Sequence, residues 1–209
     1  MKTGILLEYG KKIIEENPQI IESRKIINIY DLKFYIELEK IVKEHTIDKS
    51  DNFDNKYYIT EEYIKSNIKN LVDILEINDD IKSIINRNNI EIVHRYHKSE
   101  DNYNLGWHFD NKKLIIQNMK NKDKLHNLEI IDIIDQKIYA LFRKGENPIY
   151  TMIIYFDTYK KDFIGGELEL IDYIYLPKKG DLIIFDSREL HRVNYLKSGT
   201  RRCIVIKFY

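Results

Sequence analysis

The sequence has few of the residues that mark several large classes of protein. Its 209 residues include one cysteine, three prolines and eight glycines. These low counts exclude an internal disulfide framework, a proline-rich stalk and a glycine-rich linker. Lysine plus arginine and aspartate plus glutamate both number 34, so the formal net charge is zero. A chain without net charge has no overall field to attract nucleic acid or an anionic membrane.

The chain also lacks any apolar run of membrane-spanning length. The first residues, Met1–Glu8, lose their apolar character too soon for a signal peptide. Cys203 stands in the apolar run Cys203–Ile206, which is typical of a buried strand. We therefore expect a soluble cytoplasmic protein in a reducing compartment. The abundance of Ile, Lys, Asn and Tyr is typical of an AT-rich genome.

The hydrophobic pattern changes near residue 90, from helical spacing to short strands. Helices are predicted at 5–16, 32–45, 60–75 and 78–85, with one strand at 25–30. After residue 90 the alternation predicts many strands separated by glycine-bearing turns, at 90–96, 105–110, 114–117, 150–156, 167–173, 181–185, 190–195 and 202–209. At 43% hydrophobic residues, this length suits one domain over residues 1–209. In that domain residues 1–89 would be mainly helical support for a β-sandwich or barrel at 90–209.

A possible metal site begins with His108 and Asp110 in the predicted strand 105–110. Side chains two apart on a strand point to the same side, so an imidazole and a carboxylate would lie next to each other. A second histidine would complete the two-histidine, one-carboxylate set that holds Fe(II) and leaves positions open for substrate and O₂. His191 is the candidate. A His-x-Asp pair alone is common on surface strands, so the downstream pattern has to carry the prediction.

That downstream pattern resembles a known family. In order, the chain has the motifs His108-x-Asp110, Gly165-Gly166-Glu167-Leu168, Pro177-x-x-Gly180-Asp181, His191-x-Val193 and Gly199-x-Arg201. They resemble the Fe(II)- and 2-oxoglutarate-dependent dioxygenases, and most of all the prolyl 4-hydroxylase group. The resemblance covers roughly residues 90–209. It implies an α+β protein with a mainly β core, a double-stranded β-helix (a jelly-roll or cupin-like barrel) braced by N-terminal helices.

The resemblance also implies roles for individual residues. His108, Asp110 and His191 would bind Fe(II) and form the catalytic centre, and Arg201 would bind the distal carboxylate of 2-oxoglutarate. A planar guanidinium suits that task because it pairs with a carboxylate through two parallel hydrogen bonds. Tyr155 matches the tyrosine that assists this arginine, and Tyr96 matches one that lines the cosubstrate or substrate pocket. The purely structural alternative for Arg201 is that it forms a salt bridge at the end of a strand. If the strand register were shifted by one residue, Arg202 would bind the 2-oxoglutarate carboxylate instead.

The function implied is hydroxylation of a protein or peptide side chain, with prolyl favoured and succinate and CO₂ as products. Fe(II), 2-oxoglutarate and O₂ would be required, with ascorbate as an optional reductant. Two alternatives stay open: a nucleobase or small-molecule hydroxylase or demethylase of the same superfamily, and an inactive metal-binding jelly-roll that serves as an interaction module. No membrane partner is expected, nucleic acid is not favoured, and the oligomeric state is not indicated.

Three features depart from the family pattern. Residues 111–148 form an insertion with helical spacing at 121–143, which is either a lid or an ordinary core helix. Asp157 replaces the usual asparagine, and Lys207 stands where an aromatic residue is common in the final strand.

Other polar residues have structural interpretations. His94 and His97 would face opposite sides of a strand and are interpreted as structural. The lysines of 112–124 are interpreted as a solvated face, or else as contacts to an anionic substrate.

Overall fold

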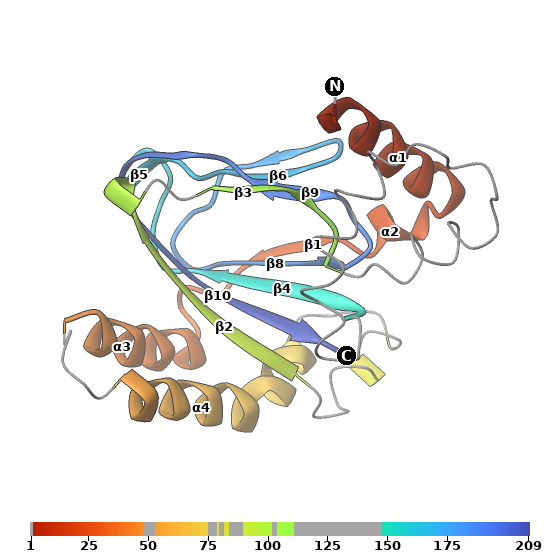
Figure 1. Ribbon diagram of the computed structural model, residues 1–209. Helices are drawn as coiled ribbons and strands as arrows, with labels where there is room; N and C mark the ends of the chain where they lie inside the picture. The colour runs from red at the N-terminus through yellow and green to blue at the C-terminus, as the bar shows by residue number, and fades with distance from the viewer. Residues whose placement is uncertain are drawn as a thin grey trace.

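Two facing β-sheets form the centre of the molecule (Figure 1). The computed structural model describes residues 2–47, 53–74, 79, 82–83, 90–101, 104–110 and 148–209. The predicted strand at 114–117 and the predicted insertion, except for its last residue, lie outside the described residues.

The larger sheet is antiparallel throughout its main path. The path has the order β1 (Lys25–Asn28), β8 (Asp181–Asp186), β4 (Tyr150–Tyr155), β10 (Leu196–Phe208) and β2 (Ile90–Lys98), and β5 (Phe163–Gly165) adds to β10. The smaller sheet has the order β3 (Leu105–His108), β9 (His191–Val193), β6 (Leu168–Leu170) and β7 (Ile174–Tyr175). A short 3₁₀ turn, η1 (Ser99–Asp101), follows β2. The two sheets share no strand among the described residues, so they do not close into one barrel. They face each other in Figure 1.

Helices cover the outside of this pair of sheets. α3 (Lys33–Ile47) and α4 (Phe53–Ile74) lie against the outer face of the larger sheet, and α1 (Lys2–Glu16) and α2 (Gln19–Glu22) lie at one end of the pair of sheets, where α2 contacts β8 (Figure 1). α1 ends at Glu16, as the Asn17-Pro18 pair predicts, because the residue before a proline avoids the helical region. None of the described helices is both long and apolar enough to cross a membrane.

The alternation of side chains along the strands divides the core into two layers. On β4, the side chains of Met152 and Ile154 join a cluster with α3 and α4 that includes Leu38, Ile64 and Leu71. Residues between them on the same strand face the other sheet, where a second cluster contains Ile153, Tyr155, Leu168, Phe185 and Cys203. Polar groups that project into this inner layer are therefore held by a rigid scaffold.

The predicted fold is confirmed. The mainly β core with helical support on one side is the architecture expected of a double-stranded β-helix. One detail of the sheet was not predicted from the sequence. β1 belongs to the larger sheet, where Ile26 pairs with Ile183. The helical first part of the chain is thus tied into the core by a strand as well as by packing.

Candidate metal centre

His108, Asp110 and His191 meet at one end of the inner layer. His108 closes β3, Asp110 follows two residues later, and His191 opens β9, the strand that pairs with β3. His108 and His191 are direct cross-strand partners, and their ring centroids are 4.2 Å apart. The three residues each offer a ligand atom, and these atoms all lie within 4.8 Å of one another. Asp110 and His191 are buried, at 6% and 4% exposure.

Backbone carbonyls fix the orientation of both imidazoles. The Nδ1 atom of His108 lies 2.8 Å from the carbonyl oxygen of Gly106, and that of His191 lies 2.8 Å from the carbonyl oxygen of Glu189. A carbonyl oxygen can only accept, so each Nδ1 carries the proton and each Nε2 presents a lone pair. The Nε2 atoms are 4.0 Å and 3.7 Å from the nearer Asp110 oxygens. The two hydrogen bonds from Nδ1 to backbone carbonyls are the kind of outer-sphere contact that orients metal-binding histidines in proteins.

The electrostatics of the site keep the donors ready for a metal. Burial, helped by the neighbouring His191, lowers the pKa of His108 to about 3, and burial also lowers the pKa of His191. Burial alone would raise the pKa of Asp110, but the imidazoles and the Lys207 ammonium outweigh it and hold that pKa below its usual range. Near neutral pH the site therefore offers two neutral imidazoles and one carboxylate. This set fits Fe(II) with open positions.

Asp110 has two further protein partners. The Lys207 ammonium donates to Oδ1 at 2.7 Å, and the Thr151 hydroxyl donates to Oδ2 at 2.8 Å. Sequence reasoning noted Lys207 only as a departure and gave Thr151 no role. The alternation along β10 was the signal that could have found Lys207, because Lys207 and Arg201 are an even number of residues apart and so face the same side.

Arg201 and Tyr155 lie together in the inner layer. Arg201 is 3% exposed and Tyr155 is fully buried, and the guanidinium carbon lies 5.4 Å from the centre of the Tyr155 ring. The Tyr155 hydroxyl is buried beside this guanidinium, which can only donate, so the hydroxyl proton has no acceptor among the described residues. A buried orphan donor beside a buried guanidinium fits the carboxylate of a bound dicarboxylic acid.

The glycine pair before β6 makes room for this arginine. Gly165 and Gly166 both have positive φ, at 78° and 66°, which favours glycine. A Cβ on Gly166 would lie 3.0 Å from the Cδ of Arg201, closer than side chains normally approach. The Gly165-Gly166 motif therefore has a local steric reason beside its place in the family pattern.

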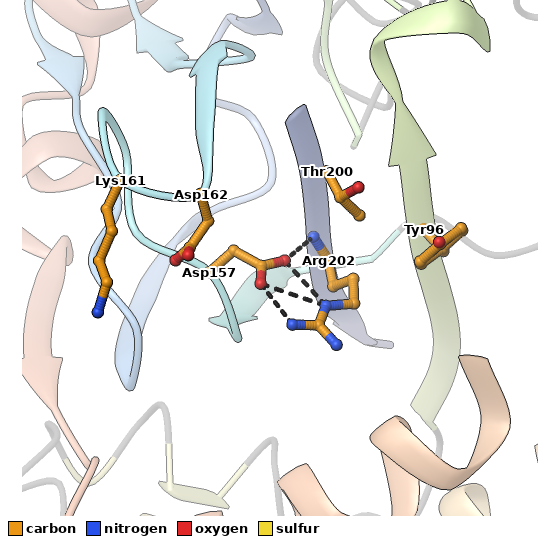
Figure 2. A pocket seen from close by; sticks show the side chains of 6 residues that line it. All are labelled: Tyr96, Asp157, Lys161, Asp162, Thr200 and Arg202. Carbon is orange, nitrogen blue, oxygen red and sulfur yellow. Dashed lines mark hydrogen bonds and ion pairs between the residues drawn. The ribbon is translucent and has the colours of Figure 1, made fainter. Parts of the chain in front are cut away.

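The structure corrects the expectation for Tyr96. This residue pairs with Arg202 across the β2–β10 ladder and is 43% exposed, so it lies on the face opposite Arg201. There it lines an open outer groove of about 520 Å³ with Asp157 and Arg202, whose mutual ion pair Figure 2 shows. The strand partner of Arg201 is His97. Burial and the charges of Arg201 and Arg95 lower the pKa of His97 to about 4.

The residues beside the candidate ligands pack into the core or pair on the outer face. Trp107 and Phe109 alternate with His108 and Asp110 and pack with Ile13, Ile20 and Leu190, which brings α1 and α2 against the ligand segment. Arg202, the alternative to Arg201 in a shifted register, is held on the outer face by Asp157, whose carboxylate accepts from the Arg202 backbone N–H at 2.6 Å and from its guanidinium. Asp157, noted as a departure from the family, thus has a structural partner.

Comparison with known proteins shows the family to which the chain belongs. The family model described as the 2OG-Fe(II) oxygenase superfamily matches residues 92–209, more than half of the chain. No curated protein matches. Among solved structures, a truncated viral collagen prolyl hydroxylase from Paramecium bursaria Chlorella virus-1 has a TM-score of 0.51 at 14% identity, covering 90% of each chain. A Pseudomonas putida prolyl-4-hydroxylase has a TM-score of 0.46 at 12% identity, covering 89% of this chain and 84% of that chain.

Membership in this family implies Fe(II), 2-oxoglutarate and O₂ as cofactor and cosubstrates. The His–Asp–His set, in which Asp110 and His191 are buried, provides a place where iron could bind. The chain belongs to the 2OG-Fe(II) oxygenase superfamily and is a 2-oxoglutarate-dependent dioxygenase.

Proposed function

We propose that this enzyme hydroxylates a side chain of a protein or peptide, with proline as the favoured residue, and releases succinate and CO₂. In the proposal His108, Asp110 and His191 hold Fe(II), while Arg201 and Tyr155 hold the distal carboxylate of 2-oxoglutarate. The observation that carries it is the burial, in the same inner layer as the His–Asp–His set, of a guanidinium and of a tyrosine hydroxyl whose proton has no acceptor among the described residues.

Each group contributes chemistry that its surroundings support. The two imidazoles donate Nε2 lone pairs because their Nδ1 protons are held by the carbonyls of Gly106 and Glu189. Arg201 brings a permanent positive charge to a cosubstrate that carries two negative charges, and Tyr155 adds a neutral donor. Fe(II), when bound, supplies the O₂ chemistry that couples decarboxylation of 2-oxoglutarate to oxidation of the substrate. The protein supplies orientation and a buried interior that excludes water.

The proposed substrate class has separate support. The solved structure with a TM-score of 0.51 bears the printed name of a viral collagen prolyl hydroxylase. That likeness concerns the fold, and we extend it to a peptide substrate as part of the proposal. The zero net charge of this chain gives no support to a nucleic-acid substrate.

The test is a succinate assay with Fe(II), 2-oxoglutarate and O₂ against a panel of proline-containing peptides. Mass spectrometry would look for the gain of one oxygen atom in the peptide. We expect peptide-dependent succinate together with hydroxyproline, and neither with the His191→Ala protein. Succinate release that no peptide stimulates, but that a free nucleoside or a small metabolite does, would contradict the proposed substrate class.

A further inference from the structure

The ammonium of Lys207 reaches the carboxylate of the proposed iron site. Lys207 lies near the end of β10 and pairs across the ladder with Thr151 of β4. Its Nζ is 2.7 Å from Oδ1 of Asp110, and the two side chains are only 18% and 8% exposed. The contact is therefore a charged hydrogen bond in a mainly buried setting, where charge–charge effects are stronger than in water.

The other oxygen of Asp110 is held by two uncharged hydroxyl groups in series. Thr151 donates its one hydroxyl proton to Oδ2 at 2.8 Å. The Ser187 hydroxyl, 2.8 Å from that of Thr151, must then be the donor in their mutual hydrogen bond. Both oxygens of Asp110 thus have a protein donor, yet a carboxylate has about four lone-pair positions, so each oxygen keeps capacity for a metal.

The lysine changes the charge of the proposed ligand set. Neutral His108 and His191 with ionised Asp110 carry one negative charge, and Lys207 offsets it. A divalent ion that binds Asp110 would therefore meet a positive charge hydrogen-bonded to the same carboxylate. That charge draws electron density from the carboxylate and repels the metal, and the repulsion is larger for Fe(III) than for Fe(II).

We propose that Lys207 is a positioning residue that holds Asp110 by a charged hydrogen bond, weakens divalent-metal binding at this site and raises the Fe(III)/Fe(II) potential. The inference rests on the proposed metal ligands. It assigns to Lys207 a role that a merely structural lysine would not have, because it concerns the charge of the residue and not the space that it fills.

The experiment compares Lys207→Met, which keeps the length and removes the charge, with Lys207→Arg, which keeps the charge. Mn(II) affinity would be measured by titration calorimetry and by the loss of the free-ion electron paramagnetic resonance signal. We expect Lys207→Met to bind Mn(II) about tenfold more tightly and to have a lower Fe(III)/Fe(II) midpoint potential. Lys207→Arg should stay close to the wild type in both measurements.

Lys179→Met is the matched control. Lys179 also pairs with a partly buried carboxylate, Glu39, at 2.6 Å, but Glu39 lies on α3 at the other face of the larger sheet. Its loss should leave Mn(II) affinity unchanged. Should Lys207→Met fail to fold, Lys207→Gln keeps a donor without the charge and should show the same tightening.

Unchanged or weaker Mn(II) binding in folded Lys207→Met and Lys207→Gln proteins would overturn the charge role. If those proteins differ little from the wild type while His191→Ala abolishes Mn(II) binding, only the inference about Lys207 fails. If His191→Ala binds Mn(II) as well as the wild type does, the proposed metal ligands are wrong, and the inference falls with them.

Discussion

The Arg24 guanidinium pairs with the carboxylate of Glu189, which is fully buried. The same Glu189 accepts, through its backbone carbonyl, the Nδ1 proton of His191 at 2.8 Å. Arg24 lies between α2 and β1 and also pairs with Asp172 at 2.8 Å. One cation from the N-terminal part of the chain therefore holds the turn that orients a proposed metal ligand.

We expect Arg24→Met to lower the free energy of unfolding by about 3 kcal/mol, because it leaves a buried carboxylate without its cation. Burial already raises the pKa of Glu189 to about 7 with Arg24 present. Urea unfolding at about pH 8.5, where Glu189 is ionised in the wild type, would measure the loss. Lys12→Met is the control, since its pair with Glu16 is exposed and such pairs contribute only about 0.3–0.5 kcal/mol. A loss for Arg24→Met no larger than that of the control would contradict the prediction.

A second prediction follows from the proposed metal ligands. His108→Ala, Asp110→Ala and His191→Ala should each remove Mn(II) binding and 2-oxoglutarate turnover, because each takes one donor from a three-residue set. Asp110→Glu should fail as well, since the longer side chain moves the carboxylate away from Nε2 of both histidines. Calorimetric titration with Mn(II) checks binding, and circular dichroism checks that each variant is folded. Stoichiometric metal with full activity in folded Asp110→Ala would exclude the assignment.

The sequence allowed prediction of the triad because local spacing determines much of its geometry. His108 and Asp110 share a strand face by alternation, whereas His191 and Arg201 were assigned because the motifs around them resemble those of the family. Helix ends with a local cause, such as α1 before Pro18, were equally predictable.

The parts of the fold and of the site that could not be predicted from the sequence depend on strand register and on long-range contacts. Tyr96 and His97 differ by one position, and a shift of one residue exchanges the two faces of a strand. The β2–β10 ladder decides between them, since it pairs Arg201 with His97. The Arg24–Glu189 pair joins residues that are far apart in sequence, and no local pattern connects them. Residues 111–147 lie outside the described residues, so whether they form a lid stays a prediction.

The two adjacent arginines should behave differently. Arg201→Ala should weaken 2-oxoglutarate binding on the order of a hundredfold, because each hydrogen bond from a charged donor contributes roughly 1.5–3 kcal/mol. Arg202→Ala should leave 2-oxoglutarate affinity nearly unchanged, since its guanidinium pairs with Asp157 on the outer face. Calorimetry with 2-oxoglutarate and Mn(II) provides the measurement. A larger effect from Arg202→Ala would mean that the register of β10 is wrong by one residue.

The final prediction concerns His97 and pH. Burial, together with the positive charges of Arg201 and Arg95, lowers the pKa of His97 to about 4, with Asp101 acting weakly in the opposite direction. An unfolded histidine has a pKa of about 6.5. Between these values the unfolded chain binds a proton at this position that the folded chain does not. His97 therefore lowers stability as pH falls from about 6.5 to about 4, and has no effect on the pH dependence above about 7.

His97→Gln removes this titration and keeps a polar side chain of similar length. Urea unfolding of both proteins at about pH 7.5 and about pH 5 would measure the change in unfolding free energy with pH. We expect the variant to lose less stability than the wild type between the two conditions, because its unfolded state no longer takes up that proton. Equal losses in the two proteins would mean that His97 titrates alike in the folded and unfolded states. That outcome would remove it from the buried inner face beside Arg201, where the ladder puts it.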